Sequence, residues 1–532
     1  MRNKRIWEIV FVGLCISILS FLLLGSTRAE SPTYDEVTYV EAGYQFLLNR
    51  DFRFDPFNPP LAKEILAIPT LINKNVIYDP VIFWPRVVVI LFTLTLAVLV
   101  YIFSKRLFGD MSAKLSLILF IFEPNILANG HYATADLIFT FFLLLSLYCY
   151  WIYRKKFTLR RVAIFSVIIG LFLSAKLTSI PFLIIPLLGL YVLDYKNKKD
   201  LIKWPFWKKR IRPILLFIFI VLITLWGTYF FKMEPPLGYR FDTHRQAIAL
   251  AKNNQVIRLL LTVPVPLGSY ISTIKQFIMF NSKLYIKRSY FLGMISLYGI
   301  SGYYFPVLFL LKTPLAELLF FFLSLYFFYK NIKRDKYILF PLFFIFFIVL
   351  FSDISLVNRY ILPVYPLVII YAGQIINLKI INKKLRYVLI AFILIWFIGG
   401  TVSSYPYFIS YANEIAGGSK TGYEYFVDSN YDWGQGLIAL KKYQDKNNIK
   451  NLQLAYFGSI DPVRYGIEYE KIKNLSINDY KKDQALKYDK NHTIAISATC
   501  WYFCGYYKNL NFKNSKPVDI VGGSILIFKI NE

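Results

Sequence analysis

The sequence predicts a polytopic helical membrane protein with a small α/β domain after its last membrane span. The 532 residues are 56% hydrophobic and 19% aromatic. Apolar runs near 20 residues, the length that crosses about 30 Å of hydrocarbon, recur along the chain. After residue 405 the apolar runs become short and alternate with charged residues. We therefore expect a transmembrane domain over 1–405 and a second domain over 406–532.

Hydropathy places about eleven membrane spans in the first domain. The predicted spans are 6–25, 81–104, 112–128, 135–153, 161–175, 179–194, 212–231, 303–329, 337–352, 360–378 and 387–405. The first span follows the basic segment MRNKR and resembles a signal peptide. Its apolar run is long and no convincing small-residue cleavage site follows, so an uncleaved span is expected.

The formal net charge of +29 is concentrated in alternate loops between the apolar runs. The basic segments are Arg2–Arg5, Lys105–Arg106, Arg154–Arg161, Lys196–Arg212, Lys330–Lys336 and Lys379–Arg386. Positive residues favour the cytoplasmic side of a membrane. The pattern predicts a multi-pass plasma-membrane protein with a cytoplasmic N-terminus and an extracytoplasmic C-terminal domain. It argues against nucleic-acid binding, because the charge reports topology.

Two of the predicted outer loops, 26–80 and 232–302, are long. In the first, apolar residues between Val37 and Leu48 recur at the helical period, but the segment is too polar to span. We expect this helix to lie along the membrane surface, with a short second helix after Pro59-Pro60. The second loop contains a polar helical stretch near 243–262.

The C-terminal domain is predicted to combine short strands with a helix. Strands are expected at 452–457, 493–498 and 520–530, and a helix at 435–444. Cys500 and Cys504 lie in this polar region and either form a disulfide in an oxidising compartment or stay reduced. Cys15 and Cys149 lie within apolar runs and are interpreted as small hydrophobic residues.

Two adjacent carboxylates, Asp35 and Glu36, begin the surface helix directly after the first span. A transferase that acts on a hydroxyl needs a carboxylate to take the hydroxyl proton. The same residues also fit a capping box, in which Thr33 is the N-cap and Glu36 reaches back to it. Both interpretations stay open, and they coexist if Glu36 caps the helix and Asp35 is left ionised.

Asp136, at the start of the fourth predicted span, is a third candidate catalytic carboxylate. The alternative is a first-turn acid that only stabilises the helix dipole. His131 lies close by and is a candidate substrate contact, although a lone histidine there is more often hydrogen-bonded at the interface. The chain has three histidines and no cluster with zinc-like spacing. No metal site or obligatory cofactor is predicted, and a divalent cation is left open.

Four cations lie at the outer ends of predicted spans, namely Lys63, Lys176, Lys312 and Arg359. Lys312 would cost about 3 kcal/mol if it faced lipid, so it needs a partner, either a nearby acid such as Glu317 or an anionic ligand. Arg359 has the fork geometry that binds a phosphate with two hydrogen bonds. Each cation alone is also explained by snorkelling to the interface. Their recurrence on the side that is otherwise poor in positive charge favours an anionic ligand.

These residues lie in segments that resemble the protein O-mannosyltransferase-like glycosyltransferases, membrane enzymes of the GT-C fold that include the aminoarabinose transferases of lipid A. The similar segments are 34–63, 131–136, 303–314, 358–366, 428–435 and 456–467. Two departures stand out. Asn58 occupies a position where bacterial members commonly have histidine. The C-terminal domain is unlike the β-trefoil module of the eukaryotic enzymes, so protein mannosylation does not follow.

The resemblance implies an inverting glycosyltransferase whose donor is a polyprenyl-phosphate-linked sugar. Asp35 would be the general base, Glu36 would support it, and Asp136 would shape the pocket. The implied substrate-binding residues are Arg359, Lys63, Lys312 and Lys176, with His131 and Tyr360 beside them. The acceptor would be a hydroxyl group of a protein, a lipid or a cell-envelope glycan. In the Asp428–Gln435 segment, the Asp432-Trp433 pair either binds acceptor or docks the C-terminal domain, and docking is favoured.

The alternative function is a non-enzymatic membrane protein, either a transporter of lipid-linked glycans or an assembly protein. A transporter is expected to show a charged path through the bilayer or inverted repeats of spans. The sequence shows neither pattern. An enzyme requires Asp35, Asp136, Lys63 and Arg359 to meet at one cavity, with Asp35 within about 15 Å of the cations, because base and leaving group flank one sugar carbon.

Overall fold

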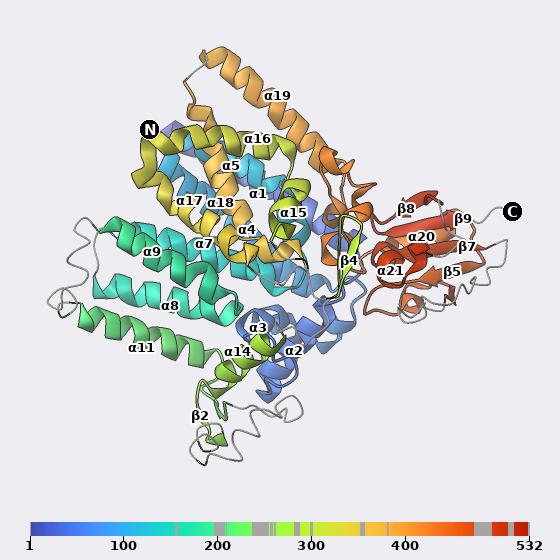
Figure 1. Cartoon of the computed structure of the whole chain (residues 1–532), viewed down its shortest axis with the longest axis horizontal. Coiled ribbons are helices and arrows are strands. Elements are labelled where there is room, and N and C mark those ends of the chain that lie inside the picture. Colours follow the sequence, from blue (N-terminus) through green and yellow to red (C-terminus); the bar gives the residue numbers. More distant parts are fainter. Residues whose placement is uncertain are drawn as a thin grey trace.

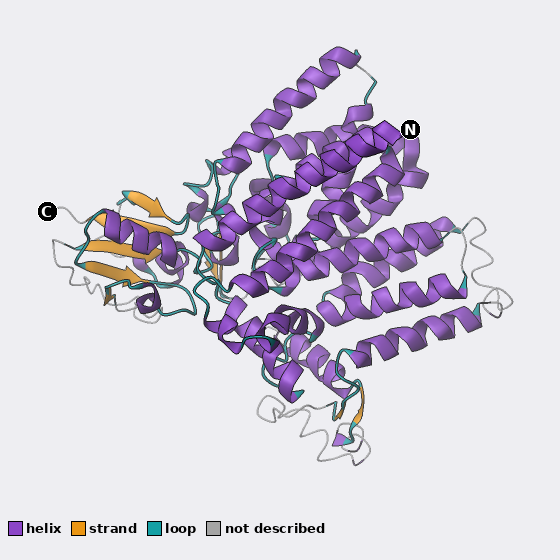
Figure 2. Cartoon of the chain, turned by 180° about the vertical axis from the view of Figure 1, so that it is seen from behind, coloured by secondary structure: helices purple, strands orange, loops and turns teal. Residues whose placement is uncertain are grey.

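Helices make up most of the computed structural model of the chain (Figures 1 and 2). The structure describes residues 2–529 except 155–157, 196–207, 209, 237–254, 256–258, 260–261, 281–287, 298–299, 301, 352–356, 380–381, 473–491 and 509–514. The polar helix predicted near 243–262 falls almost entirely outside the described residues.

Four of the described helices are long and apolar enough to cross a membrane. They are α1 (Arg2–Ala29), α4 (Phe83–Phe108), α7 (Ala135–Tyr153) and α19 (Lys383–Val402). A bent pair, Tyr304–Lys312 with Leu315–Leu350, raises the number to five. Shorter apolar helices lie at Ile180–Asp194, Ile211–Gly227 and Val364–Asn377. The chain thus has several apolar helices, while the count of about eleven spans stays a prediction.

The other described helices of this part of the chain vary in length, from six residues in α6 to 23 in α17. They are α5 (Asp110–Ile121), α6 (Pro124–Asn129), α8 (Leu159–Ala175), α9 (Ile185–Asp194), α11 (Ile211–Gly227), α14 (Gly268–Phe280), α15 (Tyr304–Lys312), α16 (Leu315–Ser324), α17 (Phe328–Leu350) and α18 (Val364–Ala372).

The span predicted over 303–329 is not one continuous helix, because the chain bends by 112° between α15 and the helices that follow. Pro314 lacks the N–H that would continue the helix and disfavours helical backbone at the residue before it. Thr313 is accordingly extended, with ψ 134°. The predicted span 112–128 is also divided, because the Glu123 side chain accepts a hydrogen bond from the Ile126 N–H and starts a new helix.

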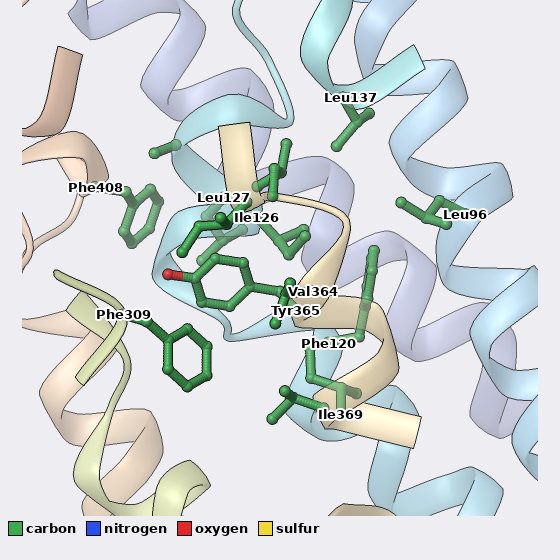
Figure 3. Packing of buried hydrophobic residues seen from close by; sticks show 14 of the residues in the cluster. Leu96, Phe120, Ile126, Leu127, Leu137, Phe309, Val364, Tyr365, Ile369 and Phe408 are labelled. Carbon is green, nitrogen blue, oxygen red and sulfur yellow. The ribbon is translucent and has the colours of Figure 1, made fainter. Parts of the chain in front are cut away.

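The core of the helical part forms around α4, which packs against α1, α5 and α7. The Thr93 hydroxyl of α4 donates a 2.7 Å hydrogen bond to the carbonyl of Gly130. Figure 3 shows Tyr365 of α18 between Ile126 and Phe309, whose ring centroid lies 5.5 Å from that of Tyr365. Burial of these apolar side chains holds the helix ends that carry the polar residues described below.

Two short helices, α2 (Glu36–Asn49) and α3 (Leu61–Ala67), form in the segment predicted as an outer loop. Both were predicted from the helical period and from Pro59-Pro60. They approach closely at Gly43, where an added Cβ would lie 2.0 Å from the carbonyl oxygen of Lys63. The absence of a side chain at Gly43 therefore allows α2 to pack directly on the backbone of α3.

The C-terminal residues form a five-stranded sheet beside the helical part (Figures 1 and 2). Its strands are β5 (Leu452–Ala455), β6 (Glu470–Lys471), β7 (Thr493–Ser497), β8 (Asp519–Val521) and β9 (Ile525–Lys529), in the order β6-β5-β7-β9-β8. β5 is parallel to both β6 and β7, whereas β9 is antiparallel to β7 and β8. Helices α20 (Leu437–Lys446) and α21 (Ala498–Phe503) accompany it.

The single strand predicted over 520–530 is instead a hairpin. Gly522 and Gly523 both have positive φ, at 60° and 64°, which reverses the chain between β8 and β9. Cys500 and Cys504 are joined by a disulfide, which resolves the alternative left open by the sequence. Cys15 and Cys149 are free and buried, as expected for small hydrophobic residues. The domain boundary at residue 405 stays a prediction.

We expect Gly43→Val to destabilise the protein by about 1–3 kcal/mol, because the added side chain must push α2 away from α3. Gly13→Val on α1 is the control, since nothing lies within 4 Å of a Cβ at Gly13. Thermal unfolding of the two detergent-solubilised variants measures the difference. Equal melting temperatures would show that the close approach of α2 and α3 is not required.

Candidate active site

Asp35 and Arg359 form an ion pair although 324 residues separate them in the sequence. Asp35 precedes the first residue of α2, and Arg359 lies in a short 3₁₀ helix, Asn358–Ile361, before α18. The Asp35 Oδ2 atom accepts a 2.8 Å hydrogen bond from Arg359 Nη2. The Asp35 side chain is 27% exposed, so this carboxylate reaches both the arginine and solvent.

A second carboxylate, Asp136, meets Arg359 from the first turn of α7. Asp35, Asp136, Arg359 and Lys176 are called the cluster below. The Oδ2 atom of Asp136 lies 3.6 Å from Arg359 Nη1, and its Oδ1 atom accepts a 2.5 Å hydrogen bond from Lys176 Nζ. Lys176 follows the last residue of α8. Two carboxylates therefore face two cations in a largely buried site. Such compensation is required, because a buried charge without a partner costs several kcal/mol.

Aromatic rings cover the two cations of this cluster. Lys176 Nζ lies 4.6 Å from the centroid of the Tyr360 ring. The Arg359 Cζ atom lies 4.2 Å from the ring of Trp433, which comes from the C-terminal part of the chain. Both distances are within the range of cation–π attraction. Arg359 Nε is buried and has no hydrogen-bond partner among the described residues.

A cavity of about 230 Å³ opens beside Lys176 and Arg359. Asn58 and Tyr360 also lie on its polar side. Most of its other walls are apolar and include Phe182, Phe305, Ile348 and Val349. The cavity is thus amphipathic, with positive charge at one side and hydrocarbon-like walls elsewhere. This combination suits a ligand with an anionic head and an apolar tail.

A second cavity of about 310 Å³ lies between the beginnings of α1 and α5. It is lined by Lys4, Glu8 and Asp110 among others, and these groups already pair with one another or with Lys105. None of the cluster residues lines this cavity. Lys4, Glu8 and Asp110 therefore connect the ends of neighbouring helices.

Lys63 lies apart from the cluster, although the sequence grouped it with Arg359. Its Nζ atom pairs with Asp55 Oδ2 at 2.7 Å and donates to the carbonyls of Asp55 and Asn58. Burial lowers the pKa of Lys63 below its ordinary value, and Asp55 opposes that shift. The ring of Tyr39, which lines the amphipathic cavity, lies 5.6 Å from Lys63 Nζ. Lys63 is thus one side chain away from the cavity.

The hydrogen bonds of Lys312 go to backbone carbonyls rather than to Glu317, the acid named from the sequence. Lys312 Nζ donates to the carbonyls of Ile409, Tyr411 and Asn430 at 2.7, 2.7 and 2.8 Å. An ammonium group has three N–H donors, so all of them are used. Lys312 fastens the segment that leads into the C-terminal sheet and has no donor left for a phosphate.

Glu36 is fully buried and fixes the beginning of α2. It accepts hydrogen bonds from Arg86 Nε and Nη2 at 2.8 and 2.7 Å. The N–H groups of Thr33 and Ala133 each donate to it at 2.7 Å. Half of the predicted capping box therefore forms, because Glu36 reaches back to Thr33, while the Thr33 hydroxyl has no hydrogen-bond partner in the described part of the chain. Glu36 holds the backbone that carries Asp35, and its oxygens face Arg86.

No role was predicted for Arg86 from the sequence. An arginine in the first turn of the apolar helix α4 could have indicated that it has a buried acidic partner. The Arg86 guanidinium also donates to the carbonyls of Thr27, Glu30 and Ser31. His131 likewise faces the end of α1. Its Nε2 lies 2.7 Å from Glu30 Oε2 and its Nδ1 2.9 Å from the Leu127 carbonyl. His131 is fully buried and is not among the residues that line the cavity, so its predicted substrate contact stays a prediction.

Among the residues that the structure describes, no group of three or more His, Cys, Asp or Glu side chains is arranged to hold a metal ion. Within the cluster itself, the nearest partners of the carboxylates are the nitrogen atoms of Arg359 and Lys176.

We expect Glu36→Gln to destabilise the protein by about 3–5 kcal/mol, because it leaves the Arg86 charge buried without its partner. Glu41→Gln on the same helix is the control, since no ion pair of Glu41 is present among the described residues. Thermal unfolding in detergent at neutral pH compares the two variants. A Glu36→Gln protein as stable as Glu41→Gln would refute the structural role of the pair.

The same pair predicts how stability changes with pH. Burial raises the pKa of Glu36, but Arg86 and the two backbone N–H groups outweigh it, so the pKa lies below the ordinary 4.5. A lowered acid pKa stabilises the fold above pH 4.5, and this stabilisation is lost as the pH falls through the lowered value. Melting temperatures measured from pH 6 downward should therefore fall less steeply in Glu36→Gln than in the wild type.

Residues 13–235 match the model of a family described as dolichyl-phosphate-mannose-protein mannosyltransferase. No curated protein sequence matches the chain. Among solved structures, apo ArnT from Cupriavidus metallidurans aligns with a TM-score of 0.48 and 13% identity, over 99% of this chain and 98% of that one. The same enzyme bound to undecaprenyl phosphate gives 0.45 and 12%, over 98% and 97%.

Archaeal oligosaccharyltransferase AglB from Archaeoglobus fulgidus, in complex with an inhibitory peptide and a dolichol-phosphate, aligns with a TM-score of 0.47 and 14% identity. That alignment covers 75% of this chain and 56% of AglB. The family model includes Asp35, Lys63, Asp136 and Lys176 but ends before Arg359. The resemblance predicted from the sequence is thus confirmed by the family model over residues 13–235.

Proposed function

We propose that this protein is a membrane glycosyltransferase that moves a sugar from a polyprenyl-phosphate carrier to a hydroxyl-bearing acceptor. The observation that carries the proposal is that Arg359 pairs with the candidate base Asp35 and also lines an amphipathic cavity. The family match supports this activity and favours it over transport of lipid-linked glycans.

The donor fits the cavity through both of its chemical parts. Its phosphate lies against Arg359 and Lys176, because a guanidinium offers paired N–H donors and an ammonium a compact charge. Its prenyl chain lies along the apolar walls that include Phe182 and Ile348. The ring of Tyr360 stays beneath Lys176 and keeps the ammonium at the cavity.

Donor binding also prepares the base. Asp35 accepts a 2.8 Å hydrogen bond from Arg359 Nη2. A phosphate that takes this N–H releases Asp35, whose partly exposed side chain then accepts a hydrogen bond from the acceptor hydroxyl. The base and the leaving phosphate thereby lie on either side of one sugar carbon, close enough for direct reaction.

In the reaction, the acceptor oxygen forms a bond to the anomeric carbon while the bond from that carbon to the phosphate oxygen breaks. The hydroxyl proton passes to Asp35, and the electron pair of the broken bond stays on the phosphate, where Arg359 and Lys176 balance the charge. Attack opposite the leaving group inverts the anomeric centre. Asp136 keeps both cations in place through its contacts of 2.5 and 3.6 Å.

The proposed arrangement in the cell follows the charge pattern of the sequence. The N-terminus is cytoplasmic, the transmembrane domain extends over 1–405, and the domain over 406–532 lies outside the membrane. The reaction then takes place at the outer face of the plasma membrane. Lys63 lies one side chain from the cavity, and Asp55 and Asn58 already take its three donors, so the proposal gives it no direct contact with the carrier phosphate.

We expect Asp35→Asn to lower transfer by at least about 100-fold, the range of general-base catalysis, without unfolding the protein. Mass spectrometry of glycoconjugates and lipid-linked sugars from cells that express either form measures the product. Asp51→Asn, an exposed carboxylate of the same segment, is the control. A fully active Asp35→Asn protein would exclude Asp35 as the base.

We expect Arg359→Lys to weaken binding of undecaprenyl phosphate by about 10- to 100-fold, because lysine cannot make the paired N–H contact. Titration of the lipid into purified protein, followed by thermal stabilisation, gives the dissociation constant. Arg464→Lys, at an exposed position in the C-terminal part, is the control. Equal affinity of Arg359→Lys and wild type would contradict the phosphate role.

A further inference from the structure

The Asp428–Gln435 segment lies directly against the segment that carries the proposed base. The Tyr34 N–H donates a 2.9 Å hydrogen bond to the Trp433 carbonyl, and the Ser31 N–H donates a 3.1 Å bond to the Gln435 carbonyl. The Ser31 hydroxyl also donates to the Gly434 carbonyl at 3.0 Å. Backbone hydrogen bonds thus place the C-terminal segment beside Asp35.

The Arg359 guanidinium lies over the Trp433 ring, with Cζ 4.2 Å from the ring centroid. The ring is 2% exposed, and the ring of Tyr132 meets it edge-on at a centroid distance of 5.8 Å. A guanidinium attracts a ring through its face, whereas its N–H groups point outward within its plane. With Cζ over the Trp433 ring, Nη1 lies 3.6 Å from Asp136 Oδ2, and Nη2 donates to Asp35 Oδ2 at 2.8 Å.

The loop that presents Trp433 is fixed by Asp432 and by Thr499 of α21. Asp432 Oδ2 accepts a 2.8 Å hydrogen bond from the Thr499 N–H. The Thr499 hydroxyl donates to the Asp432 carbonyl at 2.7 Å and accepts from the Asp428 N–H at 2.9 Å. Asp428 has a φ of 58°, a conformation that a residue other than glycine keeps only when its surroundings impose it.

We propose that Trp433 is a positioning residue for sugar transfer, whose ring fixes the plane of Arg359 so that the guanidinium edge faces Asp35 and the donor phosphate together. This inference rests on the proposed function. It assigns the Asp428–Gln435 segment to the active site, where the sequence had favoured a docking role for Asp432-Trp433. The rigid ring holds the arginine before the donor arrives, so less conformational freedom is lost on binding.

The test measures binding of undecaprenyl phosphate to the purified full-length chain and to three variants. Trp433→Phe keeps an aromatic face, Trp433→Leu removes it, and Trp501→Leu is the matched control. Trp501 is also buried, but it stacks on Phe528 of the C-terminal sheet at 4.9 Å. Each titration gives both the dissociation constant and the fraction of protein that binds.

We expect Trp433→Leu to raise the dissociation constant about tenfold and Trp433→Phe to keep it within about threefold of wild type. Trp501→Leu should lower the melting temperature and the binding fraction while the dissociation constant stays unchanged. A purely structural role of Trp433 would give the same pattern as Trp501→Leu, and that result would overturn the inference. If Trp433→Leu does not fold, Trp433→Phe is compared with Trp433→Met, which keeps the bulk of the side chain without a ring. The inference then predicts a higher dissociation constant for Trp433→Met than for Trp433→Phe.

The outcome also separates this inference from the proposed function. If the wild type binds undecaprenyl phosphate and the dissociation constants of both Trp433 variants equal that of wild type, the positioning role fails and the proposed donor stands. If the wild type does not bind undecaprenyl phosphate at all, the proposed donor fails, and the role of Trp433 falls with it.

Discussion

Arg359 meets three separate parts of the chain, and these parts stay together only while its largely buried charge is balanced. Asp35 approaches from the beginning of α2, and Asp136 from the first turn of α7. The guanidinium lies over the Trp433 ring, and the amphipathic cavity opens beside it. A largely buried guanidinium must keep its counter-charges, so the helix ends that supply the two carboxylates are held together. The same requirement makes the site receptive to an anion that replaces one of the carboxylates.

The polar groups around this cluster are of two kinds. In one kind, all hydrogen-bond donors or acceptors are used within the protein, and in the other kind the group is still open to solvent or to the cavity. Glu36 accepts four hydrogen bonds, and Lys312 donates three, so both are fully occupied inside the protein. Asp35 and Arg359, by contrast, each keep an atom for a substrate. Asp35 is partly exposed, and Arg359 lines the cavity. Glu36 and Lys312 thus fix the backbone near Asp35 and Arg359, the pair that we propose takes part in the reaction.

Much of this site could be predicted from the sequence, because single residues carried local signals. Asp35 and Asp136 lie at helix beginnings. Arg359 lies beside an apolar run, where a charged side chain is costly unless it has a partner. The pairings could not be predicted in the same way. Arg359 and Asp35 are 324 residues apart, and no local pattern encodes their contact. Lys312 was expected to use a nearby acid such as Glu317 or an anionic ligand, whereas its hydrogen bonds go to carbonyls about 100 residues away. Pro314 was a local signal for the bend, but the spans were predicted from hydropathy alone, which does not register it.

The central claim is that Arg359 exchanges Asp35 for the donor phosphate. The most direct test is an experimental structure of the full-length protein with undecaprenyl phosphate bound. The account predicts the phosphate on Arg359 and Lys176, the prenyl chain along the apolar walls of the cavity, and Asp35 displaced from its 2.8 Å contact with Arg359. A phosphate bound elsewhere, with the Asp35–Arg359 pair intact, would contradict it.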